Sequence, residues 1–304
     1  MSAHPSLSSV DAVTAALADH DYLADRGLAT TIFLATSLNR PLLLEGEAGV
    51  GKTEVAKVLA AITGGELIRL QCYEGIDANQ ALYEWNYTAQ LLHLRTAEAT
   101  GTATAASADE LEEELFSERF LVRRPLLRAI DHGGDIPPVL LIDEVDRADD
   151  EFEAFLLEAL SEFSITIPEL GTFTADVPPI VIITSNRTRD VHDALKRRAL
   201  HHWVDHPDFE REVAIVRAKA PAVPERLARQ TAMATGIVRE LGMYKPPGVA
   251  ETLDWANAMH LLGETELTEE TVDATLGTLL KYREDQDKVR RESLKHLLAA
   301  VASA

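Results

Sequence analysis

A glycine-rich segment near the start of the chain constrains its fold more than any other feature. An apolar run leads into Gly46, Gly51, Lys52 and Thr53, which have the spacing G-x-x-x-x-G-K-[ST]. Such glycines let backbone N–H groups curl around a di- or triphosphate, while the lysine places a positive charge between the β and γ phosphates and the threonine offers a hydroxyl ligand to Mg²⁺. The segment 54–61 that follows is typical of a helix whose positive end faces the anion. We therefore expect a nucleoside triphosphate to be bound here by Gly46, Glu47, Ala48, Gly49, Val50, Gly51, Lys52, Thr53 and Glu54.

A pair of acids narrows the class of phosphate-loop protein. The run 139–142 is wholly apolar and is followed at once by Asp143 and Glu144. In such enzymes the first carboxylate at a strand end holds Mg²⁺, together here with Thr53, and a second carboxylate can act as general base toward the attacking water. The order of the two motifs predicts nucleotide hydrolysis, with ATP and Mg²⁺ as cofactors.

A polar amide follows a third apolar run. Residues 180–184 read as a buried strand, and Asn186 comes two residues later. Its amide fits a group that orients the water from the side opposite Glu144. A turn-forming asparagine after a strand is the alternative interpretation.

Two arginines stand at the end of the short predicted helix 193–198. An arginine can contact the γ-phosphate bound to a neighbouring subunit, because its planar guanidinium matches the charge that develops on phosphoryl oxygens. Arg197 is our first candidate for this role and Arg198 our second. Cations that complement the negative end of a helix are the alternative.

The order of the predicted elements indicates an α/β fold followed by helices. Strands at 66–72, 139–142 and 180–184 alternate with helices at 9–23 and 30–37, which predicts a parallel sheet. We interpret 97–109 as a surface loop and 110–114 as a solvated helix. The character of the chain changes after residue 207, so we predict an α/β core over 1–207 and an all-α domain over 208–304. The helices expected in the second domain are 209–219, 225–241, 249–262, 269–282 and 292–301.

Composition excludes several classes of protein. The formal net charge of −21 argues against general binding to nucleic acid. The single cysteine, Cys72, allows no internal disulfide and suits a reducing cytoplasm, where we expect the protein to reside. We expect no signal peptide, and no apolar run approaches the length of a membrane span. A GTPase is disfavoured because the sequence holds no N-K-x-D motif.

At this point the chain resembles the ring-forming AAA+ ATPases of the MoxR branch. The resemblance lies in the segment 143–148, the helix 151–162 and the segment 165–171, which together match a helix-2-type insertion hairpin. The segments 70–75, 83–87 and 184–189 resemble the CoxD-type subgroup, which is associated with maturation of molybdenum–copper carbon monoxide dehydrogenases.

The resemblance implies a P-loop AAA+ core, a helical lid and a hexameric ring with ATP between subunits. It implies catalytic roles for Lys52, Glu144, Asn186 and an arginine of the adjacent subunit. It also implies remodelling of a protein client, possibly a metalloenzyme, with a von Willebrand A-domain partner. The lid sensor arginine of many relatives is missing from 247–255, and Arg239 or Lys245 would be a weak substitute.

Four alternatives stay open from the sequence. A nucleic-acid remodelling motor and a nucleotide-dependent scaffold with little turnover share this core. Aromatic residues at 73–87, among them Trp85, could either bind a client protein or pack this segment against the core. We favour packing. His201 and His202 would point to opposite faces of a strand, which disfavours a metal site.

Overall fold

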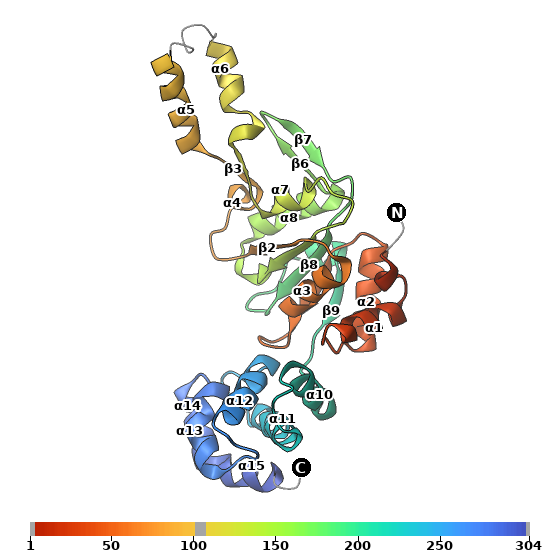
Figure 1. Cartoon of the computed structure of the whole chain (residues 1–304), viewed down its shortest axis with the longest axis vertical. Coiled ribbons are helices and arrows are strands. Elements are labelled where there is room, and N and C mark those ends of the chain that lie inside the picture. The colour runs from red at the N-terminus through yellow and green to blue at the C-terminus, as the bar shows by residue number, and fades with distance from the viewer. Residues whose placement is uncertain (1–3, 101–107, 302–304) are drawn as a thin grey trace.

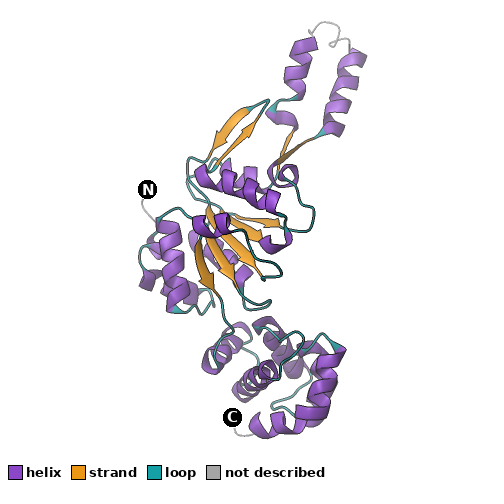
Figure 2. Ribbon diagram, turned by 180° about the vertical axis from the view of Figure 1, so that it is seen from behind, coloured by secondary structure: helices purple, strands orange, loops and turns teal. Residues whose placement is uncertain are grey.

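The computed structural model of the chain describes residues 4–100 and 108–301. Three parts follow one another along the long axis: a projecting pair of helices, a parallel sheet with flanking helices, and a bundle of helices at the carboxyl end (Figure 1). The same order is visible from behind in Figure 2, where the strands of the sheet are orange.

The central sheet has five parallel strands in the order β2-β5-β8-β1-β9. The run 139–142 is confirmed as a strand within β5, and the strands expected at 66–72 and 180–184 are confirmed as β2 and β8. Strand β1 lies between β8 and β9. The chain therefore passes from β1 to the edge strand β2 and then returns through β5 and β8. Because all strands are parallel, the segments that follow β1, β5 and β8 meet at one edge. The strands are β1 (Leu42–Glu45), β2 (Leu67–Gln71), β5 (Val139–Asp143), β8 (Ile180–Ser185) and β9 (Leu200–Trp203).

Side chains of the sheet alternate between two hydrophobic clusters, as the two-residue period of a strand requires. Leu43 and Leu140 belong to the cluster shared with α7 (Pro125–Ile130) and α8 (Asp150–Glu162). Leu42 and Leu141 belong to the cluster on the other face, shared with α1 (Val10–Asp19), α2 (Arg26–Ser37) and α3 (Lys52–Thr63). Helices on both faces explain why β1 and β5 are buried along their whole length.

The first amino-terminal helix ends earlier than the sequence indicates, whereas the second, expected from residue 30, begins at Arg26 and ends at Ser37 as expected. Ser9 caps α1 by accepting a hydrogen bond from Ala12 N, and Asp25 caps α2 through Leu28 N. The helix expected to reach residue 23 stops at Asp19, because the chain turns through Asp21 with φ 57°.

An arm, residues 83–123, interrupts the chain between α4 (Ala78–Leu82) and α7. It consists of β3 (Tyr83–Trp85), α5 (Tyr87–Thr100), α6 (Ala108–Leu115), the 3-10 turn Glu118–Phe120 and β4 (Leu121–Arg123). Strands β3 and β4 pair antiparallel at its base, and α5 and α6 project from them (Figure 1). The loop predicted at 97–109 is therefore wrong over 97–100, which lie in α5, and over 108–109, which lie in α6, while 101–107 fall outside the described residues. The helix expected at 110–114 is confirmed within α6.

Trp85 at the base of the arm is buried. Its ring packs edge-on against Tyr83 and Phe116, with ring centroids 6.1 and 5.2 Å apart. Tyr87, two residues along, is 67% exposed. Trp85 also belongs to the buried cluster shared with α7 and α8, as the packing interpretation predicts.

The hairpin expected near 165–171 is confirmed. Strands β6 (Ser164–Ile167) and β7 (Gly171–Thr174) pair antiparallel after α8, with Ile165 opposite Phe173. The short 3-10 turn Val145–Arg147 precedes α8, and α9 (Asp193–Arg198) leads from β8 toward β9.

The carboxyl-terminal helices surround the fully buried Trp255, whose Nε1 donates to Thr275 Oγ1 at 2.8 Å. A buried cluster drawn from 216–301 forms around it. The helices are α10 (Phe209–Lys219), α11 (Glu225–Glu240), α12 (Val249–Leu261), α13 (Glu269–Leu279), α14 (Arg283–Lys288), the π-helical turn Val289–Ser293 and α15 (Leu294–Val301). The sequence did not predict α14, and the division at residue 207 stays a prediction. Across the described ranges, no helix has both the length and the apolar character needed to cross a bilayer.

Candidate nucleotide-binding and active site

The phosphate loop, residues 46–53, joins β1 to the start of α3. Gly46 has φ 156°, and a Cβ at this position would lie 2.3 Å from the carbonyl oxygen of Val204. Only glycine fits there. The loop therefore turns tightly over the end of the sheet and leads directly into the amino-terminal end of α3, where free backbone N–H groups favour an anion.

Lys52 is 5% exposed, and its Nζ donates to the carbonyl oxygens of Gly46 and Glu47 at 2.8 and 2.6 Å. Burial lowers the pKa of Lys52 to about 8, although the nearby carboxylates, Asp146 foremost, favour its charged form. A buried ammonium of this kind is stabilised by an anionic ligand.

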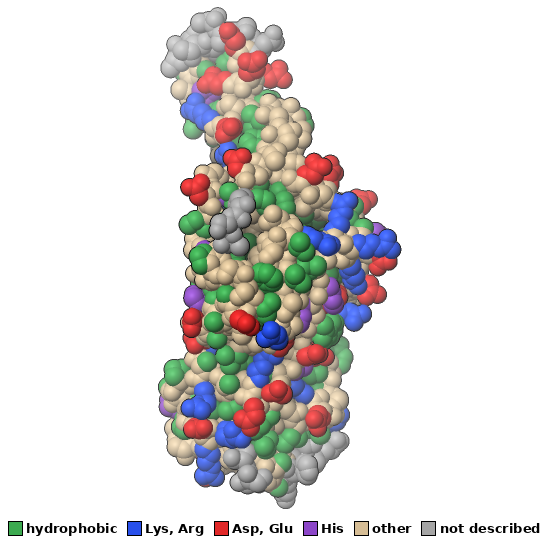
Figure 3. All heavy atoms as spheres, turned by 90° about the vertical axis from the view of Figure 1, so that its right-hand side faces the viewer, with side chains coloured by type: hydrophobic (Ala, Val, Ile, Leu, Met, Phe, Trp, Pro, Cys, Tyr) green, Lys and Arg blue, Asp and Glu red, His purple; other side chains and the backbone are tan. Residues whose placement is uncertain are grey.

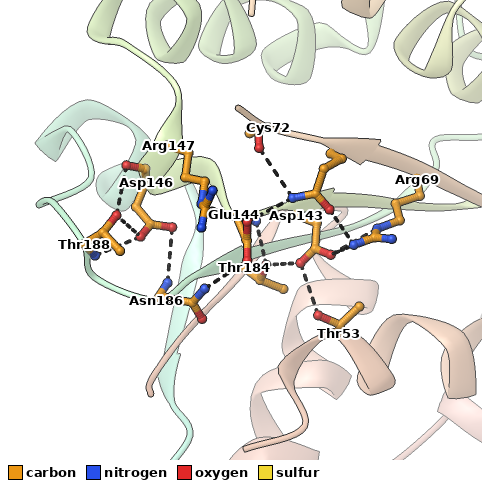
Figure 4. Close-up of polar contacts among 11 residues, drawn as sticks. Thr53, Arg69, Cys72, Asp143, Glu144, Asp146, Arg147, Thr184, Asn186 and Thr188 are labelled. Atoms are coloured by element: carbon orange, nitrogen blue, oxygen red, sulfur yellow. Dashed lines mark hydrogen bonds and ion pairs between the residues drawn. The ribbon is translucent and has the colours of Figure 1, made fainter. Parts of the chain in front are cut away.

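Asp143 ends β5 and is 3% exposed. Its Oδ1 accepts from Thr53 Oγ1 at 3.1 Å and from Thr184 Oγ1 at 2.5 Å. Its Oδ2 accepts from Arg69 Nε at 3.0 Å and from Arg69 Nη2 at 2.5 Å (Figure 4). The structure thus brings together Thr53 and Asp143, the two predicted metal ligands, and adds Arg69 and Thr184, which the sequence analysis missed.

Glu144 has a left-handed backbone, φ 56° and ψ 51°, which is uncommon outside glycine. Its N–H donates to Thr184 Oγ1 at 3.0 Å. The carboxylate is held by three donors: Gln71 Nε2 at 3.1 Å, Arg147 Nε at 3.0 Å and Asn186 Nδ2 at 3.3 Å. Glu144 and Asn186 are therefore adjacent, although 42 residues separate them in the chain.

Asp146 fixes the position of the segment that carries Asn186. This carboxylate is 2% exposed and accepts from Asn186 N at 3.2 Å, Thr188 N at 2.8 Å and Thr188 Oγ1 at 2.6 Å (Figure 4). A buried carboxylate needs such donors. Nothing in the sequence distinguishes Asp146 from a surface acid.

A cavity of about 510 Å³ opens beside these residues. Lys52, Thr53, Asp143, Glu144 and Asn186 line it together, which gives a polar region suited to phosphates and a divalent cation. Apolar side chains and Tyr22, whose pKa is raised by burial, offer a surface for a flat base. The apolar lining is Leu23, Val204, Pro207, Ile215, Val249 and Leu253. The size and the donor set fit a nucleoside triphosphate with Mg²⁺.

The helical domain contacts the phosphate loop through backbone atoms. Val249 N, at the start of α12, donates to Gly49 O at 3.0 Å, and a Cβ on Gly248 would lie 2.7 Å from Gly49 Cα. Arg239 is engaged elsewhere: it pairs with the buried Glu212 at 2.5 Å. Among the described residues that line the cavity, neither Arg239 nor Lys245 is present.

Arg197 and Arg198 lie away from the cavity of their own chain. They end α9 just before Leu200, which is the first residue of β9 and pairs with Leu42 at the start of β1. The phosphate loop, in contrast, follows the other end of β1. The four residues of β1 separate the two places by about 13 Å. Arg198 Nη1 donates to Leu157 O at 2.9 Å, and Arg197 is exposed.

The histidines after α9 pair with separate acids. His201 contacts Glu45 at 2.8 Å and His206 contacts Glu47 at 3.0 Å. Glu45 immediately precedes the phosphate loop and Glu47 lies in it, so these pairs tie β9 and the segment after it to the loop. Cys72 is buried, and burial raises the pKa of its thiol to about 12.

Comparison with known proteins gives a family and two similar structures. The family described as AAA domain (dynein-related subfamily) matches residues 41–199. No curated protein matches the sequence. Among solved structures, the chain is similar to the RuvB Holliday junction branch migration motor of Thermotoga maritima, with 14% identity, 91% of this chain and 80% of that chain covered, and a TM-score of 0.45. It is also similar to a Cytophaga hutchinsonii protein provisionally described as an ATPase, with 13% identity, 97% and 94% coverage, and a TM-score of 0.44.

The lowered pKa of Lys52 predicts pH-dependent nucleotide binding. Below its pKa of about 8 the amine is protonated and attracts phosphate, and above it the charge is lost. We expect the affinity for Mg·ATP to fall about tenfold between pH 7 and pH 9, measured by calorimetric titration.

Lys52→Met provides the control for this prediction. It should bind weakly at both pH values, because it has no proton to lose. An affinity of the unaltered protein that stays constant up to pH 9 would show that the Lys52 ammonium does not titrate as described.

Proposed function

Because the chain belongs to the AAA domain family, in its dynein-related subfamily, we propose that it is an ATPase that converts ATP and water to ADP and phosphate. The observation that carries the proposal is the convergence of Lys52, Thr53, Asp143, Glu144 and Asn186 on one cavity, although they come from three separate segments of the chain. Each matches a requirement of phosphoryl transfer, in which catalysis is mainly positioning and charge stabilisation.

The roles follow from the contacts. Lys52 binds the β and γ phosphates, and Thr53 and Asp143 hold Mg²⁺, which when bound neutralises charge on the phosphate oxygens. Glu144 accepts a proton from the attacking water, and Asn186 orients that water. Gln71 and Arg147 both bind Glu144 Oε2, so that oxygen must be released by these donors before it can accept the proton.

The active site is shared between subunits in this proposal. Arg197 and Arg198 lie about one strand length from the cavity of their own chain, so the γ-phosphate that they contact belongs to a neighbouring copy. Such head-to-tail contacts between subunits are all formed in a closed ring. The resemblance to the MoxR branch favours a ring of six subunits.

The work done by hydrolysis is remodelling of a protein client. The support is the sequence resemblance to MoxR and CoxD-type proteins, which favours a metalloenzyme client and a von Willebrand A-domain partner. The cytoplasmic location stays a prediction. A nucleic-acid motor is disfavoured by the net charge of −21. On the face in Figure 3, acidic and basic side chains are intermixed in the lower part, whereas the middle is mostly hydrophobic and uncharged.

The proposal predicts that ATP hydrolysis depends on assembly and on named residues. Specific activity should rise with protein concentration, and Glu144→Gln should lower kcat about 100-fold or more while ATP still binds. Arg197→Ala or Arg198→Ala should lower kcat by a similar factor. The measurement is steady-state phosphate release over a concentration series.

Arg226→Ala is the matched control for these arginine variants. Arg226 is 61% exposed and pairs with Glu266 in the helical domain, so its loss should leave kcat unchanged. Activity that is independent of concentration and survives loss of both Arg197 and Arg198 would contradict the shared site. Strong stimulation by DNA would favour the nucleic-acid motor instead.

The partner proposal has its own test. Glu144→Gln, which is expected to trap the ATP-bound assembly, should retain a von Willebrand A-domain protein from the native host in an ATP-dependent way. Repeated captures that identify no such protein would count against the partner.

A further inference from the structure

Arg69 reaches the nucleotide cavity from the middle of β2. Its guanidinium donates twice to Asp143 Oδ2, at 3.0 Å from Nε and 2.5 Å from Nη2. Nη2 also donates to Gln71 Oε1. The Arg69 side chain is 54% exposed, whereas that of Asp143 is 5% exposed. A half-exposed cation therefore neutralises a buried carboxylate that the proposed reaction requires for a metal ion.

The two cations compete for the same group. Asp143 Oδ1 is already occupied by the hydroxyls of Thr53 and Thr184, so Oδ2 is the oxygen held by Arg69. Two positive charges a few ångströms apart repel strongly in a partly buried site. Metal binding beside Asp143 therefore favours departure of the guanidinium from Oδ2.

The cavity offers Arg69 a second anionic partner. Arg69 lines the same cavity as Lys52, Glu144 and Asn186. Three other lining cations are paired at a distance from Asp143: Lys57 and Lys219 with Glu54, and Arg211 with Asp25. Among the described lining residues, Arg69 is thus the arginine placed at the acidic end of the cavity. A long, half-exposed side chain can turn from Asp143 toward phosphate oxygens without movement of β2.

We propose that Arg69 is a positioning cation with two partners. It neutralises Asp143 when no metal is bound, and it contacts the γ-phosphate when Mg·ATP fills the cavity. The inference rests on the proposed ATPase function. It assigns to β2 a phosphate contact that the helical lid does not supply, because the lid has no arginine at 247–255.

The proposal predicts two changes when the charge is removed. In Arg69→Met, ADP binding should become half-maximal at about three- to tenfold lower Mg²⁺ concentration, because the competing cation is gone. The preference for ATPγS over ADP should fall about tenfold, because a charge-assisted hydrogen bond to the γ-phosphate is lost. Both are measured by calorimetric or fluorescence titration, without turnover.

Two further variants make the test decisive. Arg69→Gln keeps a hydrogen-bond donor for Asp143 without the charge, and it should show the same two changes if Arg69→Met does not fold. Arg128→Met is the matched control: Arg128 is 47% exposed and pairs with Glu66, outside the cavity, so neither quantity should change.

The outcomes separate this inference from the function on which it rests. If the unaltered protein binds neither nucleotide, the proposed ATPase function fails. If it binds both, and a folded Arg69 variant keeps either the Mg²⁺ dependence or the ATPγS preference of the unaltered protein, the role of Arg69 is overturned and the ATPase proposal stands.

Discussion

The structure of the site depends on one buried carboxylate. Asp143 at the end of β5 accepts hydrogen bonds from Thr53 on α3, Thr184 on β8 and Arg69 on β2. A charge removed from water is tolerated only when its lone pairs are satisfied, so these four segments must keep their relative positions. The strand order β2-β5-β8-β1 supplies that arrangement, because it places the carboxyl ends of neighbouring parallel strands beside the phosphate loop. The fold and the chemistry therefore share the same contacts.

Strand direction also separates the phosphate loop from the two candidate arginines of the same chain. The phosphate loop follows β1, whereas Arg197 and Arg198 precede β9, which is parallel to β1 and in register with it. The two features consequently lie at opposite ends of the sheet. The helical domain contributes a backbone contact from Val249 to Gly49 and the apolar side of the cavity, while its partly buried Arg239 stays paired with the buried Glu212. In our proposal, the missing positive charge comes from a neighbouring copy and from Arg69.

The local pattern of residues predicted the sheet and the five residues expected at the phosphates, because apolar runs and glycine spacing act over short distances. Arg69, Thr184 and Asp146 could not be recognised, since they are ordinary residues of strands and turns until the strand order brings them together. The arm was missed for a different reason: α5 has almost no apolar face, and its residues 97–100 read as a loop. Trp85 at the base of the arm is buried, which the sequence favoured without showing what covers it.

The central claim is that the active site is built by two subunits, and mixing of inactive variants tests it most directly. Lys52→Met lacks the phosphate cation, and a double variant with Arg197→Ala and Arg198→Ala lacks both candidate arginines. Each should be nearly inactive alone. In a mixed assembly, an intact phosphate loop from one variant meets an intact arginine pair from the other, so the account predicts that ATP hydrolysis returns on mixing. Mixed assemblies that form but remain inactive would contradict it.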